Sequence, residues 1–388
     1  MKRICLFVLL VSGLLLASCA TAPVATQAPA AATVAPTAAC KPLKMAIIGA
    51  MTGTNASLGD WMKKGVTLAI DEKNAAGGIQ GCKLDLVVYD DEADPTKSVS
   101  ISQKVVTEDG VIAAWATTNS TNVLADIPTF QQAKIPQFTF GTNVQITQKG
   151  SDYIFRSCPP GTAFEDTLVD YLVKKGYTKF AIIGDNGAYG KGEATYETAA
   201  LARANLTPLA YEQHGADDKD FSGQLTKIIA AKPEVLLLAS SEVAAGLVAK
   251  QARQLGFEGI LAGGQPMATP KFIETAGCEV ANGVIFTAGY PGNDANDQTK
   301  KFAAAYAARW NGEIAETHGA NVYDLMQVFF IAADKANPLT PENVAAEMHK
   351  VTGYQGLQGV MNITKGGESL ATTLVGQITE CKQVYNIK

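Results

Sequence analysis

Two short segments of small polar residues have the composition of an anion-binding site. Residues 116–122 read ATTNSTN and residues 139–143 read TFGTN, and each follows an apolar run typical of a buried strand. Hydroxyl groups, together with free backbone N–H groups at a helix start, bind a carboxylate without a lysine. The alternative is that Thr118, Ser120 and Thr142 only cap helices, as such residues often do. The sequence leaves both roles open.

Signatures of nucleotide binding and of hydrolysis do not fit the chain. The segment GDNGAYGKG contains Gly190 and Lys191, but Asp185 and Gly192 stand where a P-loop needs glycine and Ser or Thr. The sequence has no GxSxG, HExxH or CxxC motif, and its three histidines lie far apart. We therefore expect a binding protein that has no catalytic residues, no cofactor and no metal.

The N-terminus has the layout of a secretory signal. Lys2 and Arg3 precede an apolar run over residues 5–16, which is too short to span a bilayer comfortably. The run ends in LASC, which resembles the lipobox of bacterial lipoproteins and implies that residues 1–18 are removed and Cys19 is lipidated. Ordinary cleavage without lipid is the alternative.

Residues 19–40 are expected to tether the folded part to the membrane. Between the two cysteines the segment contains only Ala, Thr, Pro, Val and Gln, which cannot bury enough surface to fold. The remaining chain is about twice the usual domain size, so two lobes are expected. A formal net charge of -5, with no basic stripe, argues against a nucleic-acid partner.

The cysteines fit an oxidising compartment. Cys40 and Cys82 each stand just before a predicted strand, and parallel neighbours would bring the two strand starts about 5 Å apart. We expect a disulfide between them. A second pair, Cys278 with Cys381, would leave Cys158 free.

Short apolar strands alternate with helical stretches of ten to twenty residues, which predicts an α/β fold with parallel sheets. The pattern begins twice. The motif KxAIIG at residues 44–49 recurs at residues 179–184, each time opening such a series. The repeat favours two doubly wound lobes.

The segment that begins GAMTGTNASLGDWMKKGVTLAIDEKNAAGGIQG and ends in the strand LDLVVYDD resembles branched-chain amino acid type, Leu/Ile/Val-binding-protein-like, substrate-binding proteins of ABC transporters. The likeness continues through FTFGTN, GDNGAYGKG and AKQARQLGF and covers nearly all of residues 43–380. It implies a type I periplasmic binding protein, whose two lobes are joined by a three-crossover hinge. We expect residues 41–157 plus 288–360 in lobe 1, and residues 158–287 plus 361–388 in lobe 2.

The resemblance also assigns residues of a ligand pocket. The family's carboxylate cradle falls on Thr118, on the backbone near Phe140 and Gly141, and on Thr142. Tyr189, in AYGKG, matches a pocket tyrosine of the second lobe.

Other pocket positions depart from the family pattern. The acidic residue that pairs with an α-ammonium falls on Gln265, and a neutral amide cannot offset a desolvated charge. Glu242 is a candidate for supplying that charge, although it could instead only cap its helix. Leu58 replaces an aromatic lid residue. Three aromatic residues are candidates for the apolar wall: Trp61, Trp115 and Tyr323.

Together these observations predict a monomeric, extracytoplasmic solute-binding lipoprotein. It would hold a small carboxylate-bearing ligand, an amino acid or a related compound, and deliver it to an ABC permease in the cytoplasmic membrane. Binding of amides, urea or aromatic acids is the alternative for the cargo. Sensing for a signalling partner is the alternative for the role.

Overall fold

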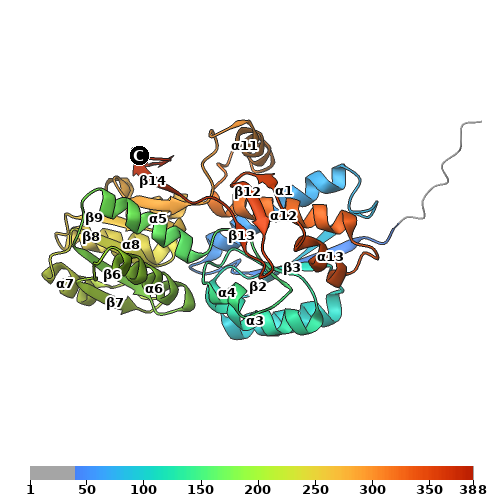
Figure 1. The fold of residues 1–388 in the computed structure, drawn as a ribbon, viewed down its shortest axis with the longest axis horizontal. Helices are drawn as coiled ribbons and strands as arrows, with labels where there is room; N and C mark the ends of the chain where they lie inside the picture. Colours follow the sequence, from blue (N-terminus) through green and yellow to red (C-terminus); the bar gives the residue numbers. More distant parts are fainter. Residues whose placement is uncertain (1–39, 388) are drawn as a thin grey trace, which may run out of the picture. The chain divides into compact units, whose positions relative to one another are not determined.

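The computed structural model describes residues 40–387 (Figure 1). The expected signal peptide, the lipidated Cys19 and most of the tether lie outside these residues. Within them, no helix is both long and apolar enough to cross a bilayer.

The first lobe is built on a five-stranded sheet in which every pair is parallel, in the order β2-β1-β3-β4-β5. Alternate residues of β1 point to opposite faces: Met45 and Ile47 pack with helices α1 and α12, and Ala46 and Ile48 face α2 and α3. The elements are β1 (Leu43–Gly49), α1 (Ala56–Ala75), β2 (Leu84–Asp90), α2 (Pro95–Lys104), β3 (Ala113–Ala116), α3 (Ser120–Ala133), β4 (Gln137–Thr139), β5 (Ile154–Arg156) and α12 (Thr317–Lys335).

The second lobe is built on a seven-stranded sheet in the order β15-β14-β10-β9-β8-β6-β7. Strand β14 pairs antiparallel with both β10 and β15, and the other pairs are parallel. Helices α5 and α6 contribute to the core on one face, and α7, α8 and α9 to the core on the other. The elements are α5 (Gly161–Lys174), β6 (Phe180–Asp185), α6 (Ala188–Arg203), β7 (Ala210–His214), α7 (Ser222–Ala230), β8 (Val235–Ala239), α8 (Glu242–Gln254), β9 (Ile260–Gly263), α9 (Pro270–Ala276), β10 (Ile285–Ala288), β14 (Leu374–Thr379) and β15 (Lys382–Tyr385).

Shorter segments complete the described chain. They are η1 (Val105–Asp109), α4 (Gln145–Gln148), η2 (Gln265–Ala268), α10 (Cys278–Ala281), α11 (Asp297–Arg309), α13 (Pro341–Met348), β11 (Tyr354–Gly356), β12 (Gly359–Ile363) and β13 (Ser369–Leu370).

The two sheets share one strand order. The series β2-β1-β3-β4-β5 matches β7-β6-β8-β9-β10, and the repeated KxAIIG motif lies in the equivalent strands β1 and β6. Because both series are parallel and covered by helices on both faces, the predicted α/β fold with two doubly wound sheets is confirmed.

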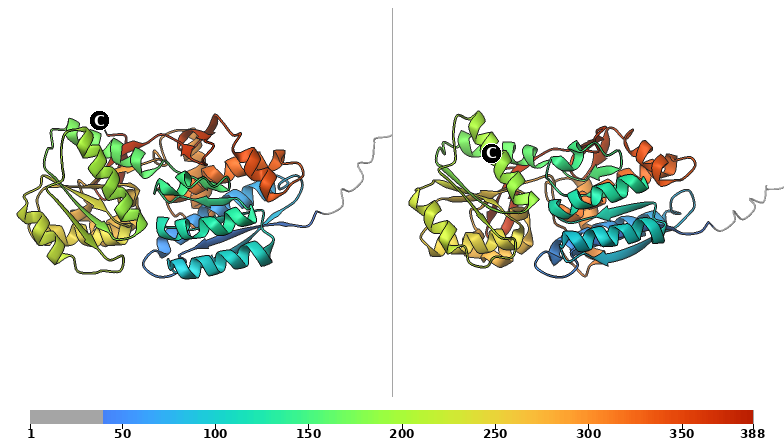
Figure 2. Two further views of the ribbon diagram at one scale, coloured as in Figure 1. Left: turned by 60° about the horizontal axis from the view of Figure 1, so that its bottom comes forward. Right: turned by 90° about the horizontal axis from the view of Figure 1, so that it is seen from below.

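The described chain crosses between the sheets three times: after β5, after β10 and before β14. Figure 2 shows the orange and red segments α12 and α13 with the blue and cyan strands of the first lobe, although at least 160 residues separate them in sequence. The expected boundary at residue 360 falls inside β12, and Met361 and Ile363 pack in the first-lobe core. The third crossing therefore follows residue 363.

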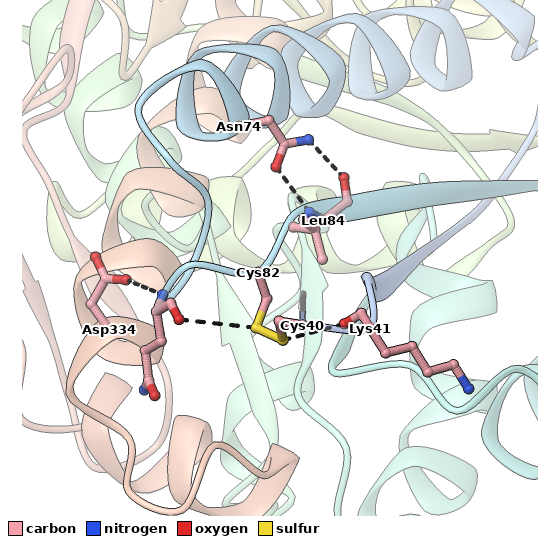
Figure 3. The surroundings of a disulfide bond; sticks show 7 residues. Cys40, Lys41, Asn74, Cys82, Leu84 and Asp334 are labelled. Carbon is pink, nitrogen blue, oxygen red and sulfur yellow. Dashed lines mark hydrogen bonds between the residues drawn. A yellow bond between two sulfur atoms is a disulfide. The ribbon is translucent and has the colours of Figure 1, made fainter. Parts of the chain in front are cut away.

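A disulfide joins Cys40 to Cys82, with Cα atoms 5.2 Å apart, at the start of the paired strands β1 and β2 (Figure 3). Beside it, the Asn74 amide donates to Leu84 O and accepts from Leu84 N, both at 2.9 Å, which ties the end of α1 to β2 (Figure 3). A second disulfide links Cys278 and Cys381, and Cys158 is free and buried.

Candidate functional site

A cavity of about 510 Å³ lies where the carboxyl ends of both parallel series meet. Loops that follow β1, β2, β3 and β4 form one wall with the start of α12, and loops that follow β6, β7, β8 and β9 form the other. Ligands of open α/β sheets bind at this edge because helix N-termini and irregular loops converge there.

Thr118 presents an unused hydroxyl on the first wall. Its side chain is buried, and its Oγ1 has no hydrogen-bond partner in the described part of the chain. The cap of α3 is the next residue, Asn119, whose side chain accepts from Asn122 N at 3.0 Å. The Thr118 hydroxyl is therefore free to donate to a ligand, beside the positive end of α3.

Phe140, Gly141 and Thr142 also line the first wall, but part of the expected cradle is already occupied. Gly141 N donates to Thr139 Oγ1 at 2.9 Å, and the Thr142 hydroxyl donates to Glu193 Oε1 across the lobes at 2.5 Å. The Thr142 hydroxyl thus contributes to lobe contact.

Gln265 faces the cavity from the second lobe in a defined orientation. Its Oε1 accepts from Asn321 Nδ2 at 2.9 Å and from Thr317 Oγ1 at 3.3 Å, both on α12. Its Nε2 has no partner in residues 40–387 apart from the nearby sulfur of Cys158, a weak acceptor. The Gln265 oxygen is therefore already bonded and is not an acceptor for a ligand ammonium, while Nε2 has only the Cys158 sulfur beside it.

Glu242 is the most deeply buried carboxyl of the cavity wall, at 1% exposure. Ser57 Oγ, from α1 of the first lobe, donates to its Oε1 at 2.7 Å, while Oε2 has no partner that the structure describes. Burial raises the pKa of Glu242, and the hydrogen bond from Ser57 and the nearby His318 oppose that rise. A cationic ligand group would supply the missing counter-charge.

His318 lines the cavity beside Glu242, whereas the sequence presents it only as one of three dispersed histidines that form no catalytic or metal-binding motif. Its ring stacks on Trp61, with centroids 5.7 Å apart, and tilts over Phe140 at 5.0 Å. Its Nδ1 bonds Glu316 Oε2 at 3.0 Å, so these contacts fix the ring. The only sequence signal for this role is that His318 stands just before the apolar segment NVYDLMQVFFIAADKA, which has the composition of a helix.

Tyr189 lines the second wall in front of three buried glutamates, Glu165, Glu193 and Glu197. Burial raises the pKa of Tyr189 well above its usual value, so its hydroxyl stays protonated. Burial also raises the pKa of Glu193 to about 7, and it raises those of Glu165 and Glu197.

Tyr323 does not line the cavity. On a helix, five residues from His318 turn its side chain by about 140°, and its hydroxyl donates to Glu72 at 2.5 Å instead. Trp115 is a core residue whose Nε1 donates a hydrogen bond to Met326 Sδ, and Trp61 stacks on the ring of His318 without lining the cavity. Within residues 40–387, no group of His, Cys, Asp and Glu could hold a metal ion.

Comparisons with known proteins cover most of the chain. The family model described as periplasmic binding protein matches residues 42–379. The chain is 28% identical to a Leu/Ile/Val-binding protein homolog of Brucella melitensis over 338 residues, which is 85% of this chain and 89% of that protein. It is 27% identical to a leucine-, isoleucine-, valine-, threonine- and alanine-binding protein of Pseudomonas aeruginosa, covering 80% and 83% of the two chains.

Solved structures share the fold. The Streptococcus pneumoniae branched-chain amino acid transporter substrate-binding protein, solved with isoleucine, superposes with a TM-score of 0.81 at 24% identity, covering 89% of this chain and 99% of that one. A leucine-binding protein of Thermotoga maritima gives a TM-score of 0.82 at 24% identity, covering 89% and 98%.

Proposed function

Because the chain belongs to the periplasmic binding protein family, we propose that it captures a small carboxylate-bearing ligand outside the cytoplasm for an ABC importer. The ligand is an amino acid or a close relative, as the names of the similar proteins indicate. The partner is a permease in the cytoplasmic membrane, to which the ligand-loaded form docks as a monomer.

The unpartnered polar atoms of the cavity carry this proposal. Thr118 Oγ1 and Gln265 Nε2 are donors, and Glu242 Oε2 is an acceptor. An amino acid satisfies both kinds, because its carboxylate accepts from the donors and its ammonium pairs with Glu242. Buried polar groups without partners are costly, so a ligand that completes them gains affinity.

Binding would also hold the lobes together. Thr118 belongs to the first lobe, whereas Gln265 and Glu242 belong to the second. A ligand that contacts both walls stabilises the closed arrangement by its differential affinity for that state.

Native mass spectrometry of the purified protein, before and after a cycle of unfolding and refolding, tests the cargo. We expect an amino acid that is lost on unfolding and rebinds on addition. A co-purifying amide, urea or aromatic acid without an amine would favour the alternative cargo, which the free Nε2 of Gln265 would suit as a donor to a carbonyl oxygen.

We further propose that Cys19 carries lipid and anchors the protein to the membrane through residues 20–39. Replacement of Cys19 by Ala should release the protein from the membrane fraction, and intact mass should show the loss of acyl chains. No turnover of the bound ligand is expected, and unchanged ligand after prolonged incubation checks this.

A further inference from the structure

The cavity wall is unusually acidic for a site that is proposed to bind a carboxylate. Five carboxyl side chains line it, and none of its lining residues within 40–387 is Lys or Arg. They are Glu92 and Asp94 from the first lobe, and Asp185, Asp217 and Glu242 from the second.

The two first-lobe carboxylates already have partners. Glu92 forms an ion pair with Lys97 at 2.5 Å, and Asp94 accepts from the N–H groups of Thr96 and Lys97 as the N-cap of α2. These groups therefore make little demand on a ligand.

The three second-lobe carboxylates have no ion-pair partner anywhere in the described chain. Asp185 accepts from Gly187 N at 2.8 Å and lies near His214 and Lys191, neither of which forms an ion pair with it, and Asp217 is exposed without a bond. Glu242 is buried, and its Oε2 is unpartnered. This buried oxygen is an observation independent of the acidic composition, because a donor that a ligand brings would supply the partner that it lacks.

Sheet order places these carboxylates in a row. Strands β7, β6 and β8 are adjacent, and Asp217, Asp185 and Glu242 lie at or just beyond their respective carboxyl ends. Neighbouring strands are about 4.8 Å apart, so Glu242 and the Asp217 loop are separated by about 10 Å. A four-carbon amino acid side chain with hydrogen bonds at both ends spans that distance.

We propose that the cavity selects an amino acid whose side chain carries a second cationic group, an ammonium or a guanidinium. This inference rests on the proposed function, which places the ligand carboxylate near Thr118. The α-ammonium pairs with Glu242, and the distal cation lies near Asp185 and Asp217. A ligand with one ammonium and one carboxylate would bring no cationic group to Asp185 or Asp217.

Three probes that share a carbon skeleton separate the charges. L-lysine carries both ammonium groups and the carboxylate, L-norleucine lacks the distal ammonium, and cadaverine lacks the carboxylate. By titration calorimetry we expect lysine to bind the protein at least tenfold more tightly than either analogue.

The outcomes distinguish the two proposals. Norleucine binding as tightly as lysine overturns cation selection and leaves the proposed function intact. Cadaverine binding as tightly as lysine retains cation selection and overturns the carboxylate of the proposed function. Absence of binding by all three overturns cation selection, and the ligand that co-purifies then decides the proposed function separately.

Variants locate the two cation sites. Glu242→Gln should weaken lysine and norleucine alike, by about 30-fold or more, because both carry the α-ammonium. The double variant Asp185→Asn with Asp217→Asn should weaken lysine by about tenfold and leave norleucine unchanged. Asp85→Asn is the matched control, because Asp85 is exposed at the start of β2, away from the cavity. Equal effects of the double variant on both ligands, or no effect on either, contradict the assignment.

Discussion

In the first lobe, the loops after β3 and β4 present a hydroxyl and the start of a helix to the cavity, whereas in the second lobe the loops after β6, β7 and β8 present carboxylates. Both sets of loops follow equivalent strands of the same sheet order. The shared topology therefore determines only where the site lies, at the carboxyl ends of the strands. The side chains after each strand decide which end of a zwitterion each wall attracts.

The two lobes also differ in the hydrogen bonding of carboxyl groups that are buried away from the cavity. In the first lobe, the buried carboxylate of Asp324 accepts from Leu357 N at 2.8 Å and from Gln358 N at 3.0 Å. In the second lobe, Glu197 is fully buried, and neither of its oxygens has a partner that the structure describes. The Asp324 carboxylate accepts from two backbone N–H groups, whereas Glu197 is buried without a donor and is favoured in its protonated, neutral form.

Removal of a disulfide gives the largest expected effect in either lobe. The Cys278–Cys381 bond closes 103 residues and the Cys40–Cys82 bond closes 42. Loop entropy predicts losses of about 4.7 and about 4 kcal/mol when each pair is replaced by serines. Denaturant unfolding of the two double variants measures this. A larger loss from the shorter loop would contradict the entropic account.

The pH dependence of stability tests the glutamate cluster. The pKa of Glu193 is raised by burial to about 7, so the folded state binds more protons than the unfolded state between about pH 4.5 and 7. Stability should therefore fall as pH rises through this window, by on the order of 3 kcal/mol.

The groups that face Glu193 are Glu165, Glu197, Arg156, Asp185 and Thr142. The first-lobe residue Asp324, whose pKa burial also raises to about 7, adds to the same slope. Melting temperatures from pH 5 to 8 should decline less when Glu193 and Glu197 are both replaced by Gln. An unchanged slope in that variant would assign the effect to other buried carboxyls, such as Glu165 in the second lobe and Asp324 in the first.

Single substitutions at Glu197 and Asp324 should act in opposite directions. Glu197→Leu removes an unpartnered buried carboxyl and should stabilise the protein by about 1–3 kcal/mol at pH 7.5. Asp324→Ala leaves two backbone N–H groups without an acceptor and should destabilise it by about 1–3 kcal/mol. Urea unfolding compares them, and two changes of the same sign would remove the contrast.

On the first wall, Thr118→Val should weaken ligand binding by about five- to tenfold, the value of one hydrogen bond. Stability should not fall, because the hydroxyl has no partner in the described chain. Thr118→Ser is the control and should retain affinity. Calorimetry and a melting curve measure the two effects, and a loss of stability without a loss of affinity would indicate a structural role.

Tyr323→Phe should have the smallest effect. Its hydroxyl donates to the exposed Glu72 and does not reach the cavity, so ligand affinity should stay unchanged and stability should change by less than about 1 kcal/mol. A clear loss of ligand affinity would indicate that the Tyr323 hydroxyl contacts the ligand.

The sequence alone determined the architecture of this protein. Strand-helix alternation and the repeated KxAIIG motif predict two doubly wound sheets, because periodicity and turn chemistry are local properties. The same reasoning identifies the loops at the carboxyl ends of strands, including those that carry Thr118, Tyr189 and Glu242.

Only the tertiary structure decided what each side chain in those loops does. Ser57 meets Glu242 across 185 residues, and Thr317 and Asn321 orient the Gln265 amide from more than 50 residues away. His318 lines the cavity and Tyr323 does not, because the two side chains point in different directions around the same helix. Hydrogen-bond partners depend on packing between lobes, and no local pattern of residue types records that packing.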